Sequence, residues 1–215
     1  MKSQLFYFFF ALTVIFTQAC DEIDNLSGGA SAPEVTYAST TYEADFFEAG
    51  SSSTPTINWN GDQGTVSLGS NITGLSVNST TGQLQWTKML PPGTHNVEVV
   101  LSNSEGQVVV PVVIENPLRG RFEGKYDDDV YYVLIFDGAG NLAVEANREN
   151  NPDLANGTYE VTSDGSLTGT YIYDFDPDSE VNILGEFNQM GSKAELTGTW
   201  DFGGGLTGDY EVSLD

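Results

Sequence analysis

The chain has 215 residues, of which 31 are Asp or Glu and 7 are Lys or Arg, so its net charge is -24. This charge excludes electrostatic binding to nucleic-acid phosphates and argues against an anionic membrane surface; it favours a solvated acidic surface, cationic partners or divalent metal ions. The 24 glycines and 12% aromatic residues predict an all-β protein, and no long helical pattern follows the apolar N-terminal segment.

Residues 1–19 have the pattern of a secretory signal peptide. Lys2 gives the start a positive charge, and Leu5 to Thr17 form an apolar run that is too short to cross a bilayer core of about 30 Å as a helix. Cys20, the only cysteine in the chain, follows closely. A free thiol is unusual in an exported chain, and no second cysteine is present to form a disulfide with it.

The residues around Cys20 suggest a lipid anchor. Thr17-Gln18-Ala19-Cys20 resembles the lipobox of bacterial lipoproteins, in which a small residue precedes the acceptor cysteine. The resemblance implies that the leader is removed before Cys20 and that its thiol carries a diacylglycerol. Acyl chains would then hold the protein in a membrane, since each buried CH₂ contributes about 0.8 kcal/mol. The alternative is an ordinary signal peptide with an incidental cysteine.

Residues 20–33 are small, polar and acidic, and we expect them to form a lipidated flexible tether with a reach of roughly 20 Å. Asp21, Glu22 and Asp24 resemble the export signals of surface lipoproteins in the Bacteroidetes. In enteric bacteria, by contrast, Asp at this position retains lipoproteins in the inner membrane. The resemblance implies a cell-envelope, outer-membrane lipoprotein that faces either the cell surface or the periplasm.

Residues 34–116 are predicted to form a β-sandwich, because strand-like runs alternate with turn signals about every 8–12 residues. The stretch 74–84, the Pro92–Thr94 turn and the Asn103–Gly106 hairpin match, in order and spacing, bacterial putative-immunoglobulin and dystroglycan-type cadherin-like domains. The resemblance implies a spacer, adhesion or ligand-presenting module. Cadherin repeats bind calcium through acidic motifs, whereas the acidic residues here are scattered.

Residues 117–215 contain a repeat of glycine, any residue and an aromatic residue. Its seven copies begin at Gly120, Gly124, Gly157, Gly169, Gly185, Gly198 and Gly208. Strands with one apolar face alternate with hairpin signals, which predicts an antiparallel meander β-barrel of about eight strands, or a half-barrel. An inward glycine lets a strand bend and lets a neighbouring aromatic ring lie over bare backbone. The pattern resembles the small lipocalin-like barrels of bacterial lipoproteins, and we expect the inward aromatics to fill a core.

The sequence offers few groups for catalysis. The only histidine, His95, shares the apolar face of a strand with Val97 and Val99, so we interpret it as a packing residue. Zinc sites with several His or Cys ligands are excluded, and the glycine-rich stretch 201–208 lacks the features of a phosphate-binding loop. We expect no enzymatic activity and no catalytic residues; a carboxylate pair of a glycoside hydrolase is the remaining enzymatic alternative.

Asp174, Asp176, Asp178 and Glu180 form the best candidate metal site. Carboxylates at alternating positions in a loop with proline can converge on Ca²⁺ through oxygen ligands, so calcium is the one cofactor considered. Asp127-Asp128-Asp129 is a second acidic cluster. For both clusters the alternative is a solvated turn that keeps a sheet edge from pairing with other chains.

Aromatic side chains could bind sugars if they are exposed, and the candidates are Trp59, Trp86, Tyr131 and Tyr132.

Taken together, the sequence predicts a lipid-anchored, non-enzymatic envelope protein that acts as a binding or adhesion module for glycans or another envelope protein. Its contact with the membrane is the lipid at Cys20, and nucleic acid is not a partner. Two alternatives are a carrier of a small apolar ligand in the second domain and a calcium-dependent adhesion module.

Overall fold

The computed structural model describes residues 31–127, 129–162 and 165–215. The predicted signal peptide, Cys20 and most of the predicted tether therefore lie outside the described residues, as does Asp128 of the second acidic cluster. The described chain contains 17 strands and no helix, which confirms the all-β prediction. Correspondingly, it holds no helical segment that is long and apolar enough to cross a membrane.

Residues 34–116 form three sheets around one hydrophobic core, as predicted for a β-sandwich. The four-stranded sheet has the order β2 (Thr41–Glu43), β9 (Gly106–Asn116), β8 (Gly93–Asn103) and β5 (Thr65–Leu68). The other sheets contain β3 (Gly50–Ser51), β7 (Leu84–Trp86) and β6 (Leu75–Val77), and β1 (Glu34–Thr36) with β4 (Thr56–Asn58). Leu84 and Trp86 on one larger sheet and Val99 and Ile114 on the other are buried in the shared core.

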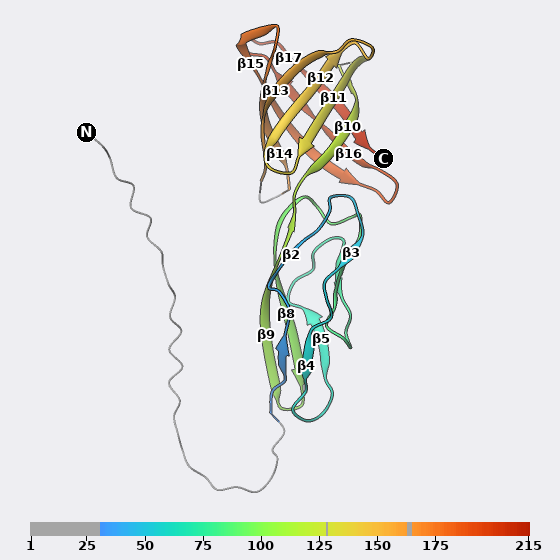
Figure 1. Cartoon of the computed structure of the whole chain (residues 1–215), viewed down its shortest axis with the longest axis vertical. Helices are drawn as coiled ribbons and strands as arrows, with labels where there is room; N and C mark the ends of the chain where they lie inside the picture. Colours follow the sequence, from blue (N-terminus) through green and yellow to red (C-terminus); the bar gives the residue numbers. More distant parts are fainter. Residues whose placement is uncertain (1–30, 128, 163–164) are drawn as a thin grey trace, which may run out of the picture.

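The remaining strands form a closed barrel, so the half-barrel alternative is wrong. The strands are β10 (Arg119–Tyr126), β11 (Val130–Asp137), β12 (Asn141–Asn147), β13 (Asp153–Val161), β14 (Leu167–Tyr173), β15 (Asp176–Gln189), β16 (Ala194–Asp201) and β17 (Thr207–Leu214). Each strand pairs antiparallel with the next, and β17 pairs back to β10. The prediction of about eight strands in meander order is confirmed. Figure 1 shows the barrel stacked on the sandwich along the long axis of the molecule.

Six of the seven repeated glycines lie opposite aromatic residues on neighbouring strands, whereas Gly185 faces Leu167 and Gly198. The facing pairs are Gly120–Phe136, Gly124–Tyr132, Gly157–Tyr171, Gly169–Tyr159, Gly198–Tyr210 and Gly208–Trp200. Directly paired residues of an antiparallel sheet lie on the same face, so each ring has bare backbone beside it. The barrel can therefore curve tightly while its interior holds large side chains. This is the local reason why the glycine–aromatic repeat allows a strongly curved sheet.

Between its two ends the barrel is filled by a single cluster of buried apolar side chains. Phe122, Leu134, Leu167 and Leu196 are completely buried within it. The Tyr132 hydroxyl, also buried, donates a hydrogen bond to the Tyr171 hydroxyl at 3.0 Å. The middle of the barrel is therefore a packed core with polar groups that pair with each other.

Tyr210 is the exception in this core, because its hydroxyl is buried without a hydrogen-bond partner among the described residues. An unpaired buried hydroxyl costs about 1–3 kcal/mol. We therefore expect Tyr210→Phe to keep or raise the free energy of unfolding, measured by urea titration. Tyr171→Phe should lower it by about 1 kcal/mol, because the Tyr132 hydroxyl would then lose its acceptor. Equal losses in the two variants would contradict the assignment.

The base of the barrel, next to the sandwich, is closed by the loop between β2 and β3. Phe46 in this loop is 5% exposed, and its ring centroid lies 5.9 Å from that of Phe122 and 6.1 Å from that of Phe187. The next residue, Phe47, is also buried and has a φ of 59°, a conformation that bulky residues rarely adopt. A side chain from the first domain thus completes the core of the second.

Polar contacts fix the same junction. The Gln189 side chain donates from Nε2 to the carbonyl oxygens of Lys88 and Leu90, at 2.9 and 3.0 Å. Arg119 at the start of the barrel forms an ion pair with Glu43 of β2 at 2.7 Å. Because both the core and the hydrogen bonds continue across the junction, the sandwich blocks one end of the barrel and leaves the other end accessible.

Candidate ligand-binding site

The accessible end of the barrel opens into a pocket of about 170 Å³, which we call the mouth pocket. Six of the side chains that line it are aromatic: Tyr126, Tyr132, Tyr171, Tyr173, Trp200 and Phe202. Asn147, Val181 and Leu206 complete the lining. The packed core forms the floor of the mouth pocket, so the pocket is a shallow chamber and not a continuous tunnel.

Strand alternation places these aromatic residues at the mouth. Tyr126 ends β10, Trp200 is the next-to-last residue of β16, and Tyr171 and Tyr173 are inward residues near the end of β14. The rings pack edge to face, with centroids 5.5 Å apart for Tyr126 and Tyr132, 5.9 Å for Tyr126 and Trp200, and 5.4 Å for Tyr171 and Tyr173. Edge-to-face packing is a favoured arrangement, so the walls hold each other in place.

Hydrogen bonds connect the aromatic walls to two carboxylates. The Trp200 indole N–H donates to Asp127 Oδ1 at 3.2 Å. The Tyr126 hydroxyl donates to the side-chain oxygen of Asn147, whose Nδ2 donates to Asp153 Oδ2 at 2.6 Å. Trp200 and Asn147 line the mouth pocket, so both carboxylates are held at its edge, although neither lines the pocket itself and Asp127 also lines a hollow on the outer wall of the barrel.

Charge at this end of the molecule is predominantly negative. The described acidic residues in or next to the turns around the mouth are Asp127, Asp129, Glu149, Asp153, Asp174, Asp176 and Asp201. Only Lys125 and Arg148 carry positive charge there, and they form ion pairs with Asp129 and Asp153. The hydrogen bond from Asn147 lowers the pKa of Asp153, so this carboxylate stays charged at neutral pH.

The phenols of the mouth pocket stay neutral. Burial raises the pKa of Tyr126, and the negative charges of Asp127 and Asp153 raise it further. Burial also raises the pKa of Tyr171 and Tyr173 well above that of a free tyrosine. At neutral pH the pocket therefore presents uncharged aromatic walls inside a ring of carboxylates.

Exposed apolar side chains surround the opening. Phe175, at the tip of the β14–β15 hairpin, is 64% exposed and stacks on Tyr173 with ring centroids 5.0 Å apart. Leu206, beside the β16–β17 turn, is 57% exposed, and Leu154 near the start of β13 is 49% exposed. Exposed apolar residues gathered around a pocket are typical of a surface that meets a partner.

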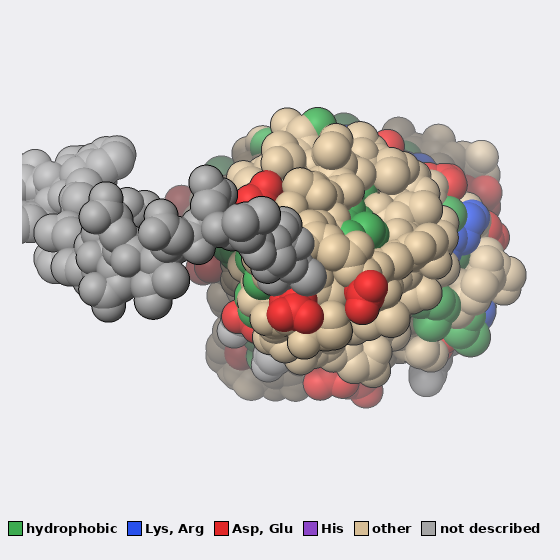
Figure 2. Space-filling model, turned by 90° about the horizontal axis from the view of Figure 1, so that it is seen from below, with side chains coloured by type: hydrophobic (Ala, Val, Ile, Leu, Met, Phe, Trp, Pro, Cys, Tyr) green, Lys and Arg blue, Asp and Glu red, His purple; other side chains and the backbone are tan. Residues whose placement is uncertain are grey.

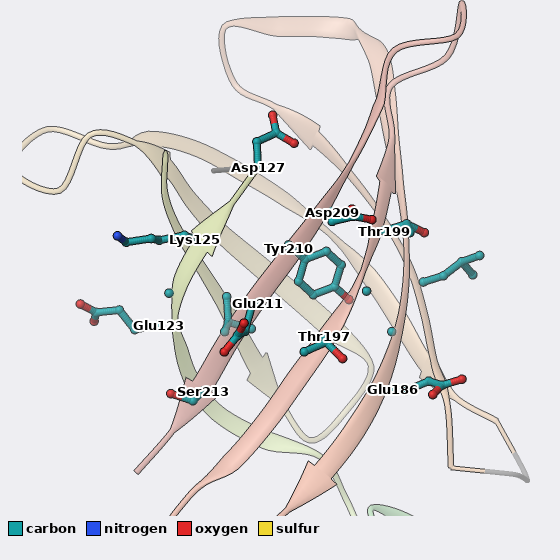
Figure 3. Close-up of a pocket in the computed structure, with 15 residues that line it drawn as sticks. Glu123, Lys125, Asp127, Glu186, Thr197, Thr199, Asp209, Tyr210, Glu211 and Ser213 are labelled. Carbon is teal, nitrogen blue, oxygen red and sulfur yellow. The ribbon is translucent and has the colours of Figure 1, made fainter. Parts of the chain in front are cut away.

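A second hollow of about 850 Å³ lies on the outer wall of the barrel, across β10, β17, β16 and β15 (Figure 3). Its charged residues do not converge. Figure 3 shows the side chains of Glu123 and Lys125 projecting to one side and that of Glu186 to the other. Without convergent groups, this hollow is a weaker candidate than the mouth pocket.

The predicted calcium loop is not a loop in the structure. Only Asp174 and Phe175 form the turn after β14, while β15 begins at Asp176 and includes Asp178 and Glu180. The pairing of β15 with β14 is irregular here, because Asp176 pairs with Tyr173 and Glu180 pairs with Ile172, which leaves residues 177–179 without a partner on β14. Among all described residues, no three His, Cys, Asp or Glu side chains form a group suited to a metal.

Most of the other residues that the sequence suggested for binding or catalysis do not line the mouth pocket. Trp86 and Tyr132 are buried, and only Tyr132 of the four aromatic candidates lines the mouth pocket. Trp59 and Tyr131 are half-buried, and the Tyr131 hydroxyl accepts a hydrogen bond from Arg121 at 2.9 Å. His95 is half-buried, with Nε2 2.8 Å from the Pro91 carbonyl oxygen.

Sequence reasoning missed the mouth pocket, although two signals pointed to it. Asp174-Phe175 and Asp201-Phe202 place the same acidic–aromatic pair at two turns, where polar residues are the rule.

Comparison with known proteins adds no assignment, because no protein-family model and no curated sequence matches the chain. The likeness to immunoglobulin-like, cadherin-like and lipocalin-like domains therefore remains one of sequence pattern.

Proposed function

We propose that this protein is a lipid-anchored, non-enzymatic module of the cell envelope that binds another envelope protein or a glycan at the mouth pocket. The observation that carries the proposal is that the residues lining this pocket come from the strand ends farthest from the sandwich. Figure 1 shows the described chain beginning at the opposite end of the molecule. A lipid on Cys20 would then hold the sandwich near the membrane. The aromatic mouth would point away from it, with the sandwich as a spacer.

The start of the described chain is fixed to the sandwich end. The Ser31 N–H donates to the Asn60 carbonyl at 3.0 Å, and Asn103 Nδ2 donates to the Ser31 carbonyl at 2.9 Å. Figure 2 shows this end, where most of the visible surface consists of backbone and side chains that are neither hydrophobic nor charged, with smaller hydrophobic and acidic areas between them. The larger group of exposed apolar residues is the one described at the mouth, which supports binding there.

The chemistry of the mouth pocket favours binding over catalysis. Its lining consists of phenols, an indole, an amide and apolar side chains. The raised pKa values of Tyr126, Tyr171 and Tyr173 keep their hydroxyls protonated at neutral pH, so these groups are poor bases and nucleophiles.

The carrier alternative is less favoured by the dimensions of the barrel. Small-molecule sites commonly have volumes of about 300–1,000 Å³ and bury most of their ligand. The mouth pocket has about 170 Å³, and the interior below it is packed. Calcium-dependent adhesion through Asp174–Glu180 is also less favoured, because no three of the described His, Cys, Asp or Glu side chains form a group suited to a metal.

Two measurements test the proposal. Wild-type protein is expected in the membrane fraction and Cys20→Ala in the soluble fraction; a membrane-bound Cys20→Ala variant would contradict lipid anchoring.

Immobilised protein is expected to capture components of the envelope, and Leu206→Ser should reduce capture several-fold. Leu184→Ser is the matched control, because Leu184 is 58% exposed but lies on the outer wall, away from the mouth. Equal capture by the two variants would contradict binding at the mouth.

A further inference from the structure

We infer that the mouth pocket receives the positively charged end of a lysine or arginine side chain from a protein partner. The inference rests on the proposed function and specifies its ligand. It is drawn from three features of the same site: aromatic walls, a ring of carboxylates and a small volume.

The aromatic walls are suited to a cation. The faces of Trp and Tyr rings attract ammonium and guanidinium groups when these lie within about 6 Å of the ring centroid, and such cages commonly recognise organic cations. Tyr126, Tyr173 and Trp200 come from three different strands and surround one chamber. A cation that enters the chamber would therefore meet ring systems on several sides.

The fixed carboxylates select the sign of the charge. Asp127 is held by the indole of Trp200, and Asp153 by Asn147, so both negative charges stay next to the aromatic walls. Burial raises the pKa of the Tyr126 hydroxyl, which lines the pocket, and the charges of Asp127 and Asp153 contribute to the same shift. An anionic group would be repelled, whereas a cationic group would be stabilised by attraction that water screens less at a partly enclosed site.

The volume and the hydrogen bonds argue for a side chain in preference to a sugar. A cavity of about 150 Å³ accepts one benzene molecule, so the mouth pocket, at about 170 Å³, accepts one side-chain end. The hydroxyls that could bind a sugar already pair internally, Tyr132 with Tyr171 and Tyr126 with Asn147. The exposed Phe175 and Leu206 would contact the protein surface that carries the cation.

Arg148 shows the pairing that an incoming cation would make. Its guanidinium forms an ion pair with Asp153 at 3.1 Å, yet 65% of its side chain is exposed. Because Arg148 is not among the residues that line the mouth pocket, the chamber itself is left without a cation from the described chain. A basic side chain of the partner would supply it.

The test uses the purified full-length chain and four small probes. The cationic probes are the N-acetyl, N-methylamide forms of lysine and arginine, and the neutral probes are the same forms of norleucine and citrulline. Binding is followed by the NMR signal of the Trp200 indole N–H, identified by its loss in Trp200→Leu. We expect both cationic probes to shift this signal and to bind at least about tenfold more tightly than their neutral counterparts.

Added salt and charge variants give independent readouts. Raising the salt concentration from about 0.02 M to about 0.5 M should weaken binding of the cationic probes by screening. Asp127→Asn and Asp153→Asn should each weaken it about threefold to tenfold, whereas Glu186→Gln, which removes one charge from the outer wall, should not. The comparison of probes on the wild-type protein does not depend on whether any variant folds.

Three results would overturn the inference: neutral probes that bind as tightly as cationic ones, a shift at Trp86 in place of Trp200, or an equal loss of binding in Glu186→Gln. If Leu206→Ser still reduces capture of envelope components several-fold while the cationic probes do not bind, the proposed function stands and the cationic ligand is wrong. If neither the capture experiment nor the probe experiment gives the expected result, both proposals fail.

Discussion

The Gly198→Ala variant is expected to unfold with a free energy about 3 kcal/mol below that of the wild-type protein. A methyl group on Gly198 would overlap the backbone carbonyl oxygen of Leu184 on the adjacent strand. Backbone atoms cannot rotate away as a flexible side chain can, so β15 and β16 would have to separate at this point. Gly157→Ala should have a similar effect, because its methyl group would overlap the Thr170 carbonyl oxygen.

Gly191→Ala is the control for this prediction. Gly191 lies in the β15–β16 turn, no heavy atom lies within 4 Å of the position that a methyl group would take, and its φ is not in the left-handed region. We expect its free energy of unfolding to stay within about 0.5 kcal/mol of the wild-type value. Urea titrations of all three variants provide the comparison. Similar midpoints for Gly198→Ala and Gly191→Ala would show that the close backbone approach does not limit the barrel.

Phe46→Ala is the second substitution with a large expected effect, a loss of about 3–5 kcal/mol. The Phe46 ring packs against Phe122 and Phe187 at the base of the barrel and is almost completely buried. Its removal would leave a cavity and admit water to the lower end of the barrel core. Because Phe46 belongs to the first domain, we also expect the variant to unfold in two separate transitions, one for each domain.

Phe175→Ala serves as the comparison for Phe46→Ala. Phe175 is also a phenylalanine outside the strands, but 64% of its surface is exposed. It should therefore lose less than about 1 kcal/mol. Thermal unfolding followed by calorimetry distinguishes the two variants. If Phe46→Ala is as stable as Phe175→Ala, the first domain does not contribute to the core of the barrel.

The strands of the second domain could be predicted because the pattern that identifies each strand lies within that strand's own residues. Each Gly-x-aromatic copy marks an inward glycine and an inward ring two residues apart, and period-2 alternation extends the assignment along the strand. Closure is different, because it depends on β17 meeting β10, and these strands lie at opposite ends of the domain sequence. A local pattern is the same in an open sheet and in a closed barrel.

The site was harder to predict than the fold, for two physical reasons. Tyr126 and Trp200 occupy the same inward face as residues of the packed core. They line a pocket only because they lie near the open end of the barrel. The alternating carboxylates at 174–180 satisfy both a loop pattern and a strand pattern. Pro177 favoured a loop, and the structure satisfies both patterns: β15 begins at Asp176, but the residues from Pro177 to Ser179 have no partner on β14 because the pairing register shifts there.

The pairing of β17 with β10 has a consequence for how the chain is made. Glu123 to Tyr126 pair with Tyr210 to Ser213, and this short ladder is the last contact of the barrel that a growing chain can form. Until β17 is synthesised, β10 and β16 remain open sheet edges, which readily pair with other chains. During synthesis the chain is therefore most prone to aggregate just before β17 is complete, and pairing of β17 removes both open edges.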